Sequence, residues 1–465
     1  MKKLKLITIL LFFLVGFANA QSLSQKLQVA FQKFSSNESL KYASVSFSVL
    51  DVNSGALIFG DHENTGLASA STLKTITSAT ALALLGEDYI FKTPVLYTGT
   101  IHDGILDGDL IVKGNGDPTL GSWRWETTTK EQVLHQILLA LQQKGIRQIN
   151  GKIIGDDSAW DTQSLPSGWI WQDIGNYYGA GSSALAWGEN QFELTFSPSK
   201  TIGGAVKISN QNEVDPFLDI KNELQTGAYG TGDRVYAYSA PYTHLIYLRG
   251  TYGIDLYKKI GLALQDPALA LAYDLDTYLQ KNQIKTEGFN TIRLAHKNPE
   301  KENELTVIAS PPLKEIVYWL NQKSINLYAE QLLRTLGFKF GKSASTVDGV
   351  KTIQKFWEAQ GIDAATLNIV DGSGLSPADK VTSLSMAKVL FFAKKQTWFD
   401  AYYKSLPIHN EMKMKSGTIN DVLAYAGYAQ LDSKTPVCFS LIVNNYTGSI
   451  SAIRSKMFSL LNALK

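Results

Sequence analysis

An alternation of polar and apolar residues near the start of the chain predicts a β-hairpin. Residues 44–49 alternate between serine and an apolar side chain, which is the period-two pattern of a half-buried strand. The turn Asn-Ser-Gly at 53–55 leads into the apolar run 56–59, which predicts the second strand of the hairpin. A helical pattern over about 71–85 follows, with apolar residues near one face and Gly86 at its end.

The C-terminal part of the chain resembles its beginning in pattern. Runs at about 411–418, 422–430 and 437–444 predict three strands, and the apolar spacing over about 449–464 predicts a final helix. Strands at both ends with helices between them indicate one antiparallel sheet built from the two termini. We therefore expect an α+β fold.

The middle of the chain, residues 93–302, has a different pattern of short strand-like runs and glycine turns. Aromatic rings can form sugar-binding platforms, but we favour packing inside small β-rich modules, which need large side chains. This region therefore predicts a β-rich insertion, as one unit or as two nested ones. Six of the nine tryptophans lie within it close together, namely Trp123, Trp125, Trp160, Trp169, Trp171 and Trp187.

The N-terminus changes the meaning of the overall charge. The 465 residues carry 44 Lys plus Arg and 42 Asp plus Glu, a formal net charge of +2. Residues 1–20 hold three lysines, a short apolar run and Ala-Asn-Ala at the end, which predicts a cleavable secretory signal. The alternative is an uncleaved anchor, although the run is shorter than the ~20 residues that span a bilayer.

Removal of this signal leaves a nearly neutral protein, which offers no electrostatic basis for binding nucleic acid or an anionic membrane. No later segment of the sequence is long and apolar enough to span a membrane. We therefore expect an exported protein, periplasmic or associated with the cell wall, without an integral membrane segment once the signal is removed.

The sequence contains no motif that predicts a cofactor or metal site. The single cysteine, Cys438, lies in the apolar run 437–443 and is expected to be a buried structural thiol. The six histidines are scattered without zinc-ligand spacing. Residues 337–343 end in Gly-Lys-Ser, but Leu336 stands where a phosphate-binding loop needs its first glycine. No metal and no cofactor are predicted.

Ser71 and Lys74 lie at the start of the first predicted helix. A serine and a lysine three residues apart share one helix face, so the amine can reach the hydroxyl. The free N–H groups of a helix start also favour negative charge beside the serine. The pattern is weak alone, because Ser-x-x-Lys also occurs at 197–200, in a predicted loop, and at 385–388, inside a predicted helix.

Two further motifs give Ser71 a context. Ser324-Ile325-Asn326 precedes a helical run, and Lys415-Ser416-Gly417-Thr418 ends a predicted strand. The ordered trio resembles the active-site-serine penicillin-recognising enzymes, whose signatures are Ser-x-x-Lys, Ser-x-Asn and Lys-Thr/Ser-Gly. Ile325 and Ser416 differ from the commonest forms of these motifs, but neither removes a required hydroxyl, amide or ammonium group.

The spacing between the first two motifs limits the resemblance to one branch of this family. The interval from Ser71 to Ser324 leaves room for some 200 inserted residues, which looks like the D-alanyl-D-alanine carboxypeptidase/endopeptidase branch of penicillin-binding protein 4 type. The stretches at 116–120, 310–313 and 371–376 also look similar to that branch. The resemblance implies a serine β-lactamase/transpeptidase-like domain, an antiparallel sheet flanked by helices, split by a large β-rich insertion. The expected division is 1–20 signal peptide, 21–92 catalytic domain, 93–302 insertion and 303–465 catalytic domain.

The resemblance also implies roles for the motif residues. The catalytic residues would be Ser71 as the nucleophile, Lys74 as its base and Ser324 as a proton relay. The substrate-binding residues would be Asn326, Lys415, Ser416, Gly417 and Thr418. Burial and the neighbouring cation Lys415 are both expected to lower the pKa of Lys74. Ser373 is expected to belong to a structural turn near the site.

The implied function is a serine-type D-alanyl-D-alanine carboxypeptidase and endopeptidase. Its partners would be the peptides of peptidoglycan, with β-lactam antibiotics as inhibitors. A β-lactamase is the nearest alternative, although a 200-residue insertion is foreign to compact lactamases. The other alternative is a catalytically silent cell-wall-binding or scaffolding protein.

Overall fold

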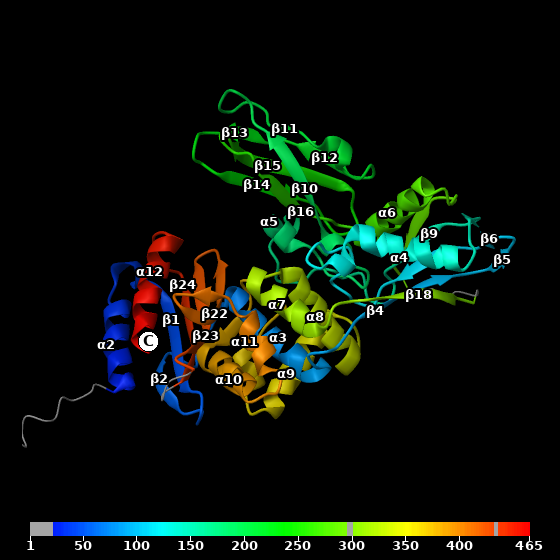
Figure 1. Ribbon diagram of the computed structural model, residues 1–465. Helices are drawn as coiled ribbons and strands as arrows, with labels where there is room; N and C mark the ends of the chain where they lie inside the picture. The colour runs from blue at the N-terminus through cyan, green and yellow to red at the C-terminus, as the bar shows by residue number, and fades with distance from the viewer. Residues whose placement is uncertain (1–21, 295–300, 432–435) are drawn as a thin grey trace, which may run out of the picture.

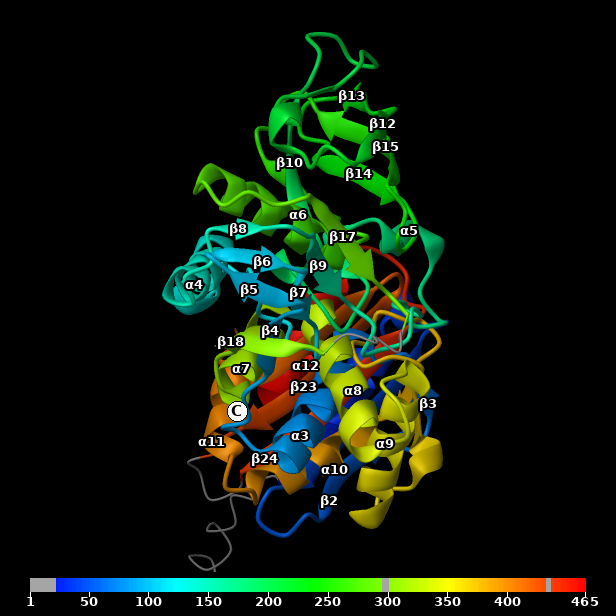
Figure 2. The ribbon, with the colours of Figure 1, turned by 90° about the vertical axis from the view of Figure 1, so that its right-hand side faces the viewer.

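The computed structural model describes residues 22–294, 301–431 and 436–465, so the predicted signal at 1–20 lies outside the described residues. No helix in these ranges has the length and apolar character needed to cross a membrane. Figures 1 and 2 show a mixed helix and sheet unit that contains both ends of the described chain, and further sheets stacked on one side of it.

A six-stranded antiparallel sheet joins the two ends of the chain, as predicted. Its order is β2-β1-β24-β23-β22-β21, and the N-terminal strand β1 pairs along its whole length with β24. The predicted hairpin at the start of the chain forms the β1–β2 edge. The strands are β1 (Ser44–Asp51), β2 (Leu57–Asp61), β21 (Ile408–His409), β22 (Met412–Ile419), β23 (Val422–Ala429) and β24 (Val437–Asn444).

Helices cover both faces of this sheet. α2 (Leu23–Ser35) and α12 (Ile450–Leu461) pack on one face, where Phe47 and Val49 join their apolar cluster. Two of the three serines of the predicted half-buried strand do not face solvent, and only Ser44 is exposed. Ser46 and Ser48 are buried, and each lies 2.7 Å from the hydroxyl of Ser383. The prediction of a half-buried strand was wrong here, because helix α10 (Ser383–Lys394) covers the polar face. Cys438 is a buried free thiol, as expected.

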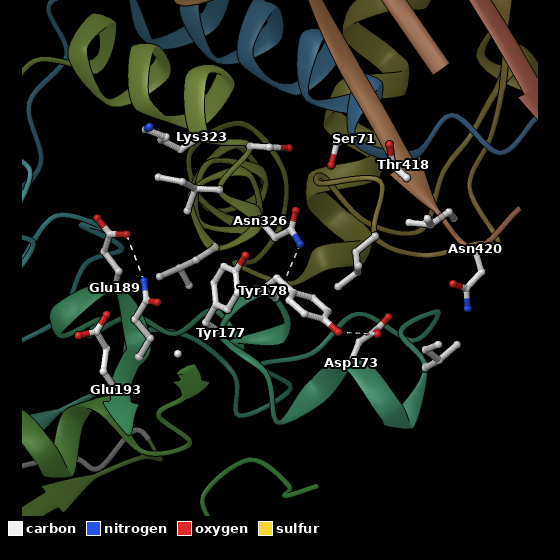
Figure 3. Close-up of a pocket in the computed structure, with 18 of the residues that line it drawn as sticks. Ser71, Asp173, Tyr177, Tyr178, Glu189, Glu193, Lys323, Asn326, Thr418 and Asn420 are labelled. Atoms are coloured by element: carbon white, nitrogen blue, oxygen red, sulfur yellow. Dashed lines mark hydrogen bonds between the residues drawn. The ribbon is translucent and has the colours of Figure 1, made fainter. Parts of the chain in front are cut away.

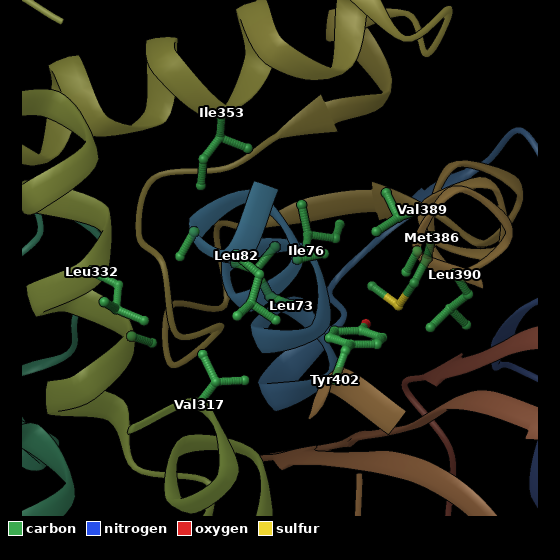
Figure 4. Close-up of a cluster of buried hydrophobic side chains, with 14 of the residues drawn as sticks. Leu73, Ile76, Leu82, Val317, Leu332, Ile353, Met386, Val389, Leu390 and Tyr402 are labelled. Atoms are coloured by element: carbon green, nitrogen blue, oxygen red, sulfur yellow. The ribbon is translucent and has the colours of Figure 1, made fainter. Parts of the chain in front are cut away.

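Helix α3 (Lys74–Leu85) lies at the centre of the second helical layer (Figure 4). Residues 74–82 are all buried, so the helix is enclosed on every side rather than on the one apolar face predicted for it. Because α3 carries Lys74, this enclosure removes the amine from water. The surrounding helices are α7 (Leu313–Lys323), α8 (Asn326–Phe340), α9 (Thr346–Ala359), α10 (Ser383–Lys394) and α11 (Phe399–Ser405).

A second sheet of mixed direction lies beside this unit. Its order is β17-β9-β7-β4-β18, and α4 (Lys130–Gln143) and α6 (Pro267–Lys281) pack with it around a separate apolar cluster. Its strands are β4 (Lys92–Tyr97), β7 (Leu110–Lys113), β9 (Ile153–Asp156), β17 (Phe289–Ile292) and β18 (Asn303–Ala309). Small sheets are formed by β5 (Thr100–His102), β6 (Ile105–Asp107) and β8 (Gln148–Ile149), and by β3 (Gly66–Leu67), β19 (Leu367–Asn368) and β20 (Lys380–Thr382).

The outermost sheets surround a third apolar cluster drawn from residues 194–262 (Figure 2). They follow the short helix α5 (Trp171–Ile174) in the chain. Their strands are β10 (Gln191–Ser197), β11 (Lys207–Ile208), β12 (Asp219–Asn222), β13 (Gln225–Gly227), β14 (Asp233–Tyr238), β15 (Leu245–Gly253) and β16 (Lys259–Ala263).

We propose a domain division that modifies the expected one. The two apolar clusters of the middle region support two nested units, an inner one and one near 191–263. Strand β18 pairs with β4 and not with the six-stranded sheet, so we draw the second boundary near residue 310 instead of at 303. The catalytic unit then consists of residues 22–91 and 310–465.

Candidate active site

Ser71 lies in a 3₁₀ turn, Ala70–Leu73, that leads directly into α3. Ala70 adopts a left-handed conformation, with φ of 45°, so the chain turns sharply just before the serine. Strand β22 passes close by at Gly417. A Cβ at this position would lie 2.6 Å from the Ser69 carbonyl oxygen and 2.9 Å from the Ser71 nitrogen. The glycine of the Lys-Ser-Gly motif is therefore needed for the strand to reach the serine.

The amine of Lys74 has three hydrogen-bond partners. Its Nζ lies 2.9 Å from Ser71 Oγ, 2.6 Å from Asn326 Oδ1 and 2.6 Å from the carbonyl oxygen of Ser373. The last two atoms can only accept. A neutral amine that donates its two N–H groups to them keeps its lone pair for the Ser71 hydroxyl. The contacts are therefore compatible with a base for this serine.

The side-chain amide of Asn326 is oriented by a backbone atom of the middle region. Its Nδ2 donates to the carbonyl oxygen of Tyr178 at 2.7 Å. Because that carbonyl only accepts, the NH₂ group must face Tyr178, and Oδ1 must face Lys74. Asn326 Oδ1 therefore accepts a hydrogen bond from Lys74 Nζ whether the amine is neutral or protonated.

Lys415 and Ser324 form a second polar pair. Lys415 Nζ donates to Ser324 Oγ at 3.0 Å and to the carbonyl oxygen of Ser416 at 2.8 Å. Ser324 directly follows α7 in a left-handed conformation, with φ of 56°. Together with the Ser71–Lys74 pair, this contact places residues of all three sequence motifs in one region of the fold.

Burial dominates the electrostatics of both lysines. It lowers the pKa of Lys74 to about 7, against the opposing effect of the carboxyl groups of Asp371, Glu330 and Asp379. The pKa of Lys415 also lies well below its usual value, first through burial and then through repulsion by Lys74. The expected effect of burial on Lys74 thus holds, while the repulsion between the two cations lowers the pKa of Lys415.

The loop 371–376 supplies the third contact of Lys74, and a buried carboxylate organises it. Asp371 Oδ1 accepts the N–H groups of Ser373 and Gly374 at 2.9 and 2.6 Å. Its Oδ2 accepts the indole N–H of Trp169 and the N–H of Ser376, both at 2.8 Å. This network fixes the Ser373 carbonyl that faces the lysine. The turn predicted at Ser373 is structural, and it touches the site through its backbone.

Two further buried carboxyl groups adjoin this loop. Glu330 Oε1 accepts the N–H of Gly372 at 2.9 Å, and burial followed by the charge of Asp371 raises the pKa of Glu330 to about 8. Burial and Asp371 also raise the pKa of Asp379 well above its usual value. Sequence reasoning missed Glu330, Asp379, Trp169 and Tyr178. Only the run 371–376 carried a signal, through its resemblance to the family.

A cavity of about 790 Å³ opens beside these groups (Figure 3). Ser71, Ser324, Asn326 and Thr418 line it, whereas Lys74, Lys415 and Gly417 are buried behind its wall. Ser416 is not among the lining residues. The other two Ser-x-x-Lys matches do not line the cavity: Ser197 is the last residue of β10, and the hydroxyl of Ser385, in α10, donates to that of Thr366.

Similarity to known proteins agrees with this geometry. The chain is 26% identical over 440 residues to the D-alanyl-D-alanine carboxypeptidase DacB of Haemophilus influenzae, covering 88% of this chain and 87% of that protein. It is 25% identical over 428 residues to a D-alanyl-D-alanine carboxypeptidase of Actinomadura sp., covering 86% and 77%.

The same fold is found in a solved structure. The crystal structure of penicillin binding protein 4 (dacB) from Haemophilus influenzae superposes with a TM-score of 0.77 at 24% identity, over 93% of this chain and 97% of that one. Residues 27–464, nearly the whole described chain, match the sequence profile of the D-Ala-D-Ala carboxypeptidase 3 (S13) family. The chain belongs to the D-Ala-D-Ala carboxypeptidase 3 (S13) family of serine peptidases.

Proposed function

We propose that this protein is a serine-type D-alanyl-D-alanine carboxypeptidase and endopeptidase that acts on the peptides of peptidoglycan through an acyl-enzyme on Ser71. Membership of the S13 family supports the reaction class. The observation that carries the residue assignment is the environment of Lys74. Two acceptor-only partners leave its lone pair for Ser71, and its pKa of about 7 leaves a large share of the amine neutral at neutral pH.

In the first step, Ser71 Oγ attacks the carbonyl carbon of the penultimate D-alanine while Lys74 Nζ takes the hydroxyl proton. The backbone N–H groups of Ser71 and Thr418 stabilise the oxyanion, at about 3 kcal/mol per donor. The proton then passes to the leaving nitrogen with the help of Ser324, and the C–N bond breaks. Water hydrolyses the acyl-enzyme and restores Ser71.

The Lys415–Ser324 pair and strand β22 recognise the substrate in this proposal. Lys415 pairs with the carboxylate of the residue that leaves, and the hydroxyl groups of Ser416 and Thr418 add hydrogen bonds to it. Asn326 orients the substrate backbone as well as the amine. Lys415 is held in place by Ser324 at 3.0 Å, so the carboxylate binding site and the proton relay form one unit.

One mechanism serves two activities. A leaving D-alanine gives carboxypeptidase action, and a leaving D-centre of a cross-linking diamino acid, which also bears a carboxylate, gives endopeptidase action. β-Lactams would acylate Ser71 because their ring amide and carboxylate resemble the D-alanyl terminus. The penicillin binding protein 4 of Haemophilus influenzae has been crystallised with a β-lactam.

We place the enzyme outside the cytoplasm, in the periplasm or at the cell wall. The predicted secretory signal supports this location. Peptidoglycan peptides, which are found in that compartment, are the proposed partners.

The direct test is incubation of the purified protein with a pentapeptide stem and with a cross-linked muropeptide dimer. We expect free D-alanine from the first and monomers from the second, with both activities lost in Ser71→Ala. A chromogenic β-lactam added in parallel should label the protein stoichiometrically. Sustained drug turnover would favour the β-lactamase alternative, and a folded protein that yields neither product would contradict the proposal.

A further inference from the structure

The cavity extends well beyond the catalytic serine. Its volume of about 790 Å³ is that of a site for a ligand of drug size, whereas a leaving D-alanine is a single small residue. In Figure 3, Ser71 and Thr418 lie on one side of Asn326, and Lys323 lies on the other. We call this second side the distal arm. Tyr177, Glu189, Glu193 and Lys323 of the lining lie on this side in Figure 3. Gln191 donates to Glu189, and Trp123 directly precedes Arg124, which pairs with Glu189, so these two lining residues belong to the same side.

The distal arm lies on the side of the leaving group. Lys415, proposed to pair with the carboxylate of the leaving residue, donates to Ser324 Oγ at 3.0 Å. Lys323 directly precedes Ser324 and lines the cavity beside it. A chain that continues from a leaving residue held at Lys415 therefore passes into the distal arm, whereas a leaving D-alanine has nothing to place there.

The charges of the arm favour an anionic ligand. Lys323 is exposed and makes no hydrogen bond or ion pair with any described residue. The neighbouring charges are already paired: Arg124 Nε lies 2.6 Å from Glu189, and Glu193 lies 3.1 Å from Lys259. The ammonium group of Lys323 is thus the unpaired charge among the described residues of this arm.

Two aromatic rings complete the arm. The side chains of Trp123 and Tyr177 are 57% and 55% exposed, although each lines the cavity. Large rings that remain exposed in a cavity wall mark a surface that packs against a ligand. Both rings come from the middle region of the chain, whereas Lys323 is the last residue of α7 in the catalytic unit. Residues of both parts of the chain therefore form the distal arm.

We infer that the distal arm binds the leaving stem peptide of a peptidoglycan cross-link, with Lys323 pairing with one of its carboxylates and Trp123 and Tyr177 packing on its backbone. This inference rests on the proposed function and makes the enzyme suited to endopeptidase cleavage. A pentapeptide stem that loses D-alanine leaves the arm empty. The two activities should therefore respond differently to changes in the arm.

The test compares kcat/KM for a cross-linked muropeptide dimer and for a pentapeptide stem in two matched pairs of variants. Lys323→Gln is matched by Lys314→Gln, which lies on the same helix outside the cavity lining. Trp123→Ala is matched by Trp171→Ala, whose side chain is 58% exposed and does not line the cavity.

We expect Lys323→Gln and Trp123→Ala each to lower kcat/KM for the dimer roughly three- to tenfold, mainly through KM. Their pentapeptide activity and their labelling by a β-lactam should stay within twofold of wild type, and both control variants should match wild type on both substrates. Equal losses on both substrates, no loss on the dimer, or a wild-type enzyme that releases D-alanine but never cleaves the dimer would each overturn the inference. Failure of wild type on both substrates would instead refute the proposed function.

Discussion

Trp169 donates its indole N–H to Asp371 at 2.8 Å, across 202 positions of sequence. Asp371 holds the loop whose Ser373 carbonyl contacts Lys74, so the middle region of the chain reaches the catalytic amine through a single buried carboxylate. Tyr178 makes a second such link through the amide of Asn326. The inserted residues thus help to position Lys74 and Asn326, two of the proposed site residues.

Trp169→Phe should slow acylation by a β-lactam about tenfold, because it removes a hydrogen bond to a charged group, worth about 1.5–3 kcal/mol, and loosens the loop at Lys74. Trp160→Phe is the matched control. Trp160 is also buried in the middle region, but its indole N–H has no partner among the described residues. Stopped-flow acylation over a pH series would measure both variants. Equal rates for the two would show that the Trp169 bond does not position the lysine.

The pH dependence of acylation should follow Lys74. Its pKa of about 7 means that acidification protonates the amine and removes the lone pair that takes the Ser71 proton. The acylation rate should therefore fall about tenfold per pH unit below roughly pH 6 and level off above pH 8. Lys74→Gln should lower the plateau by about 10² to 10⁴ and abolish this limb of the profile. A rate independent of pH between 5 and 8 would assign the base elsewhere.

Substitution of Glu330 tests whether this carboxyl group near Lys74 is protonated. A pKa of about 8 makes Glu330 mostly neutral at pH 7, and glutamine keeps both this neutral state and an acceptor for the Gly372 N–H. Glu330→Gln should therefore acylate within about threefold of wild type at pH 7, whereas Glu330→Ala should lose tenfold or more. If Glu330 were ionised at pH 7, glutamine would shift the acid limb to lower pH by removing a charge that raises the pKa of Lys74.

Gly417→Ala should damage the site more than the fold. The added methyl group meets the Ser69 carbonyl oxygen and the Ser71 nitrogen, so β22 must move away from the nucleophile. We expect an acylation rate lower by about 10² or more, with a loss of 1–3 kcal/mol in the free energy of unfolding. Gly66→Ala is the control, because its methyl group makes ordinary contact with Lys380 at 3.4 Å. Wild-type acylation by Gly417→Ala would contradict the close approach.

The sequence patterns predicted the strands of the sheet of the two termini well, because the alternation at 44–49 and the strand-like runs near the C-terminus are local properties of each segment. They also located Ser71, Lys74, Ser324, Asn326 and Lys415, through motifs whose residues meet in one region of the fold. The enclosure of α3 could not be predicted in this way. It depends on the helices between 313 and 405, whose packing has no signature in α3 itself.

The carboxyl groups around Lys74 escaped prediction for the same reason. Glu330 lies inside a helix that reads as an ordinary amphipathic one, and only its depth in the fold makes its charge state unusual. Likewise, the contact of Trp169 with Asp371 joins two regions that share no pattern. The expectation that Lys415 would lower the pKa of Lys74 overlooked these acids, which act on Lys74 in the opposite direction.

The central claim is that Ser71 is the nucleophile and Lys74 its base. Mass spectrometry of the intact protein and of its peptides after brief exposure to a penicillin tests this claim most directly. The account predicts a mass increase of one penicillin per chain, located on Ser71, absent from Ser71→Ala and formed far more slowly in Lys74→Gln. A label on Ser324 or another residue, or an unlabelled wild-type protein that is folded, would contradict it.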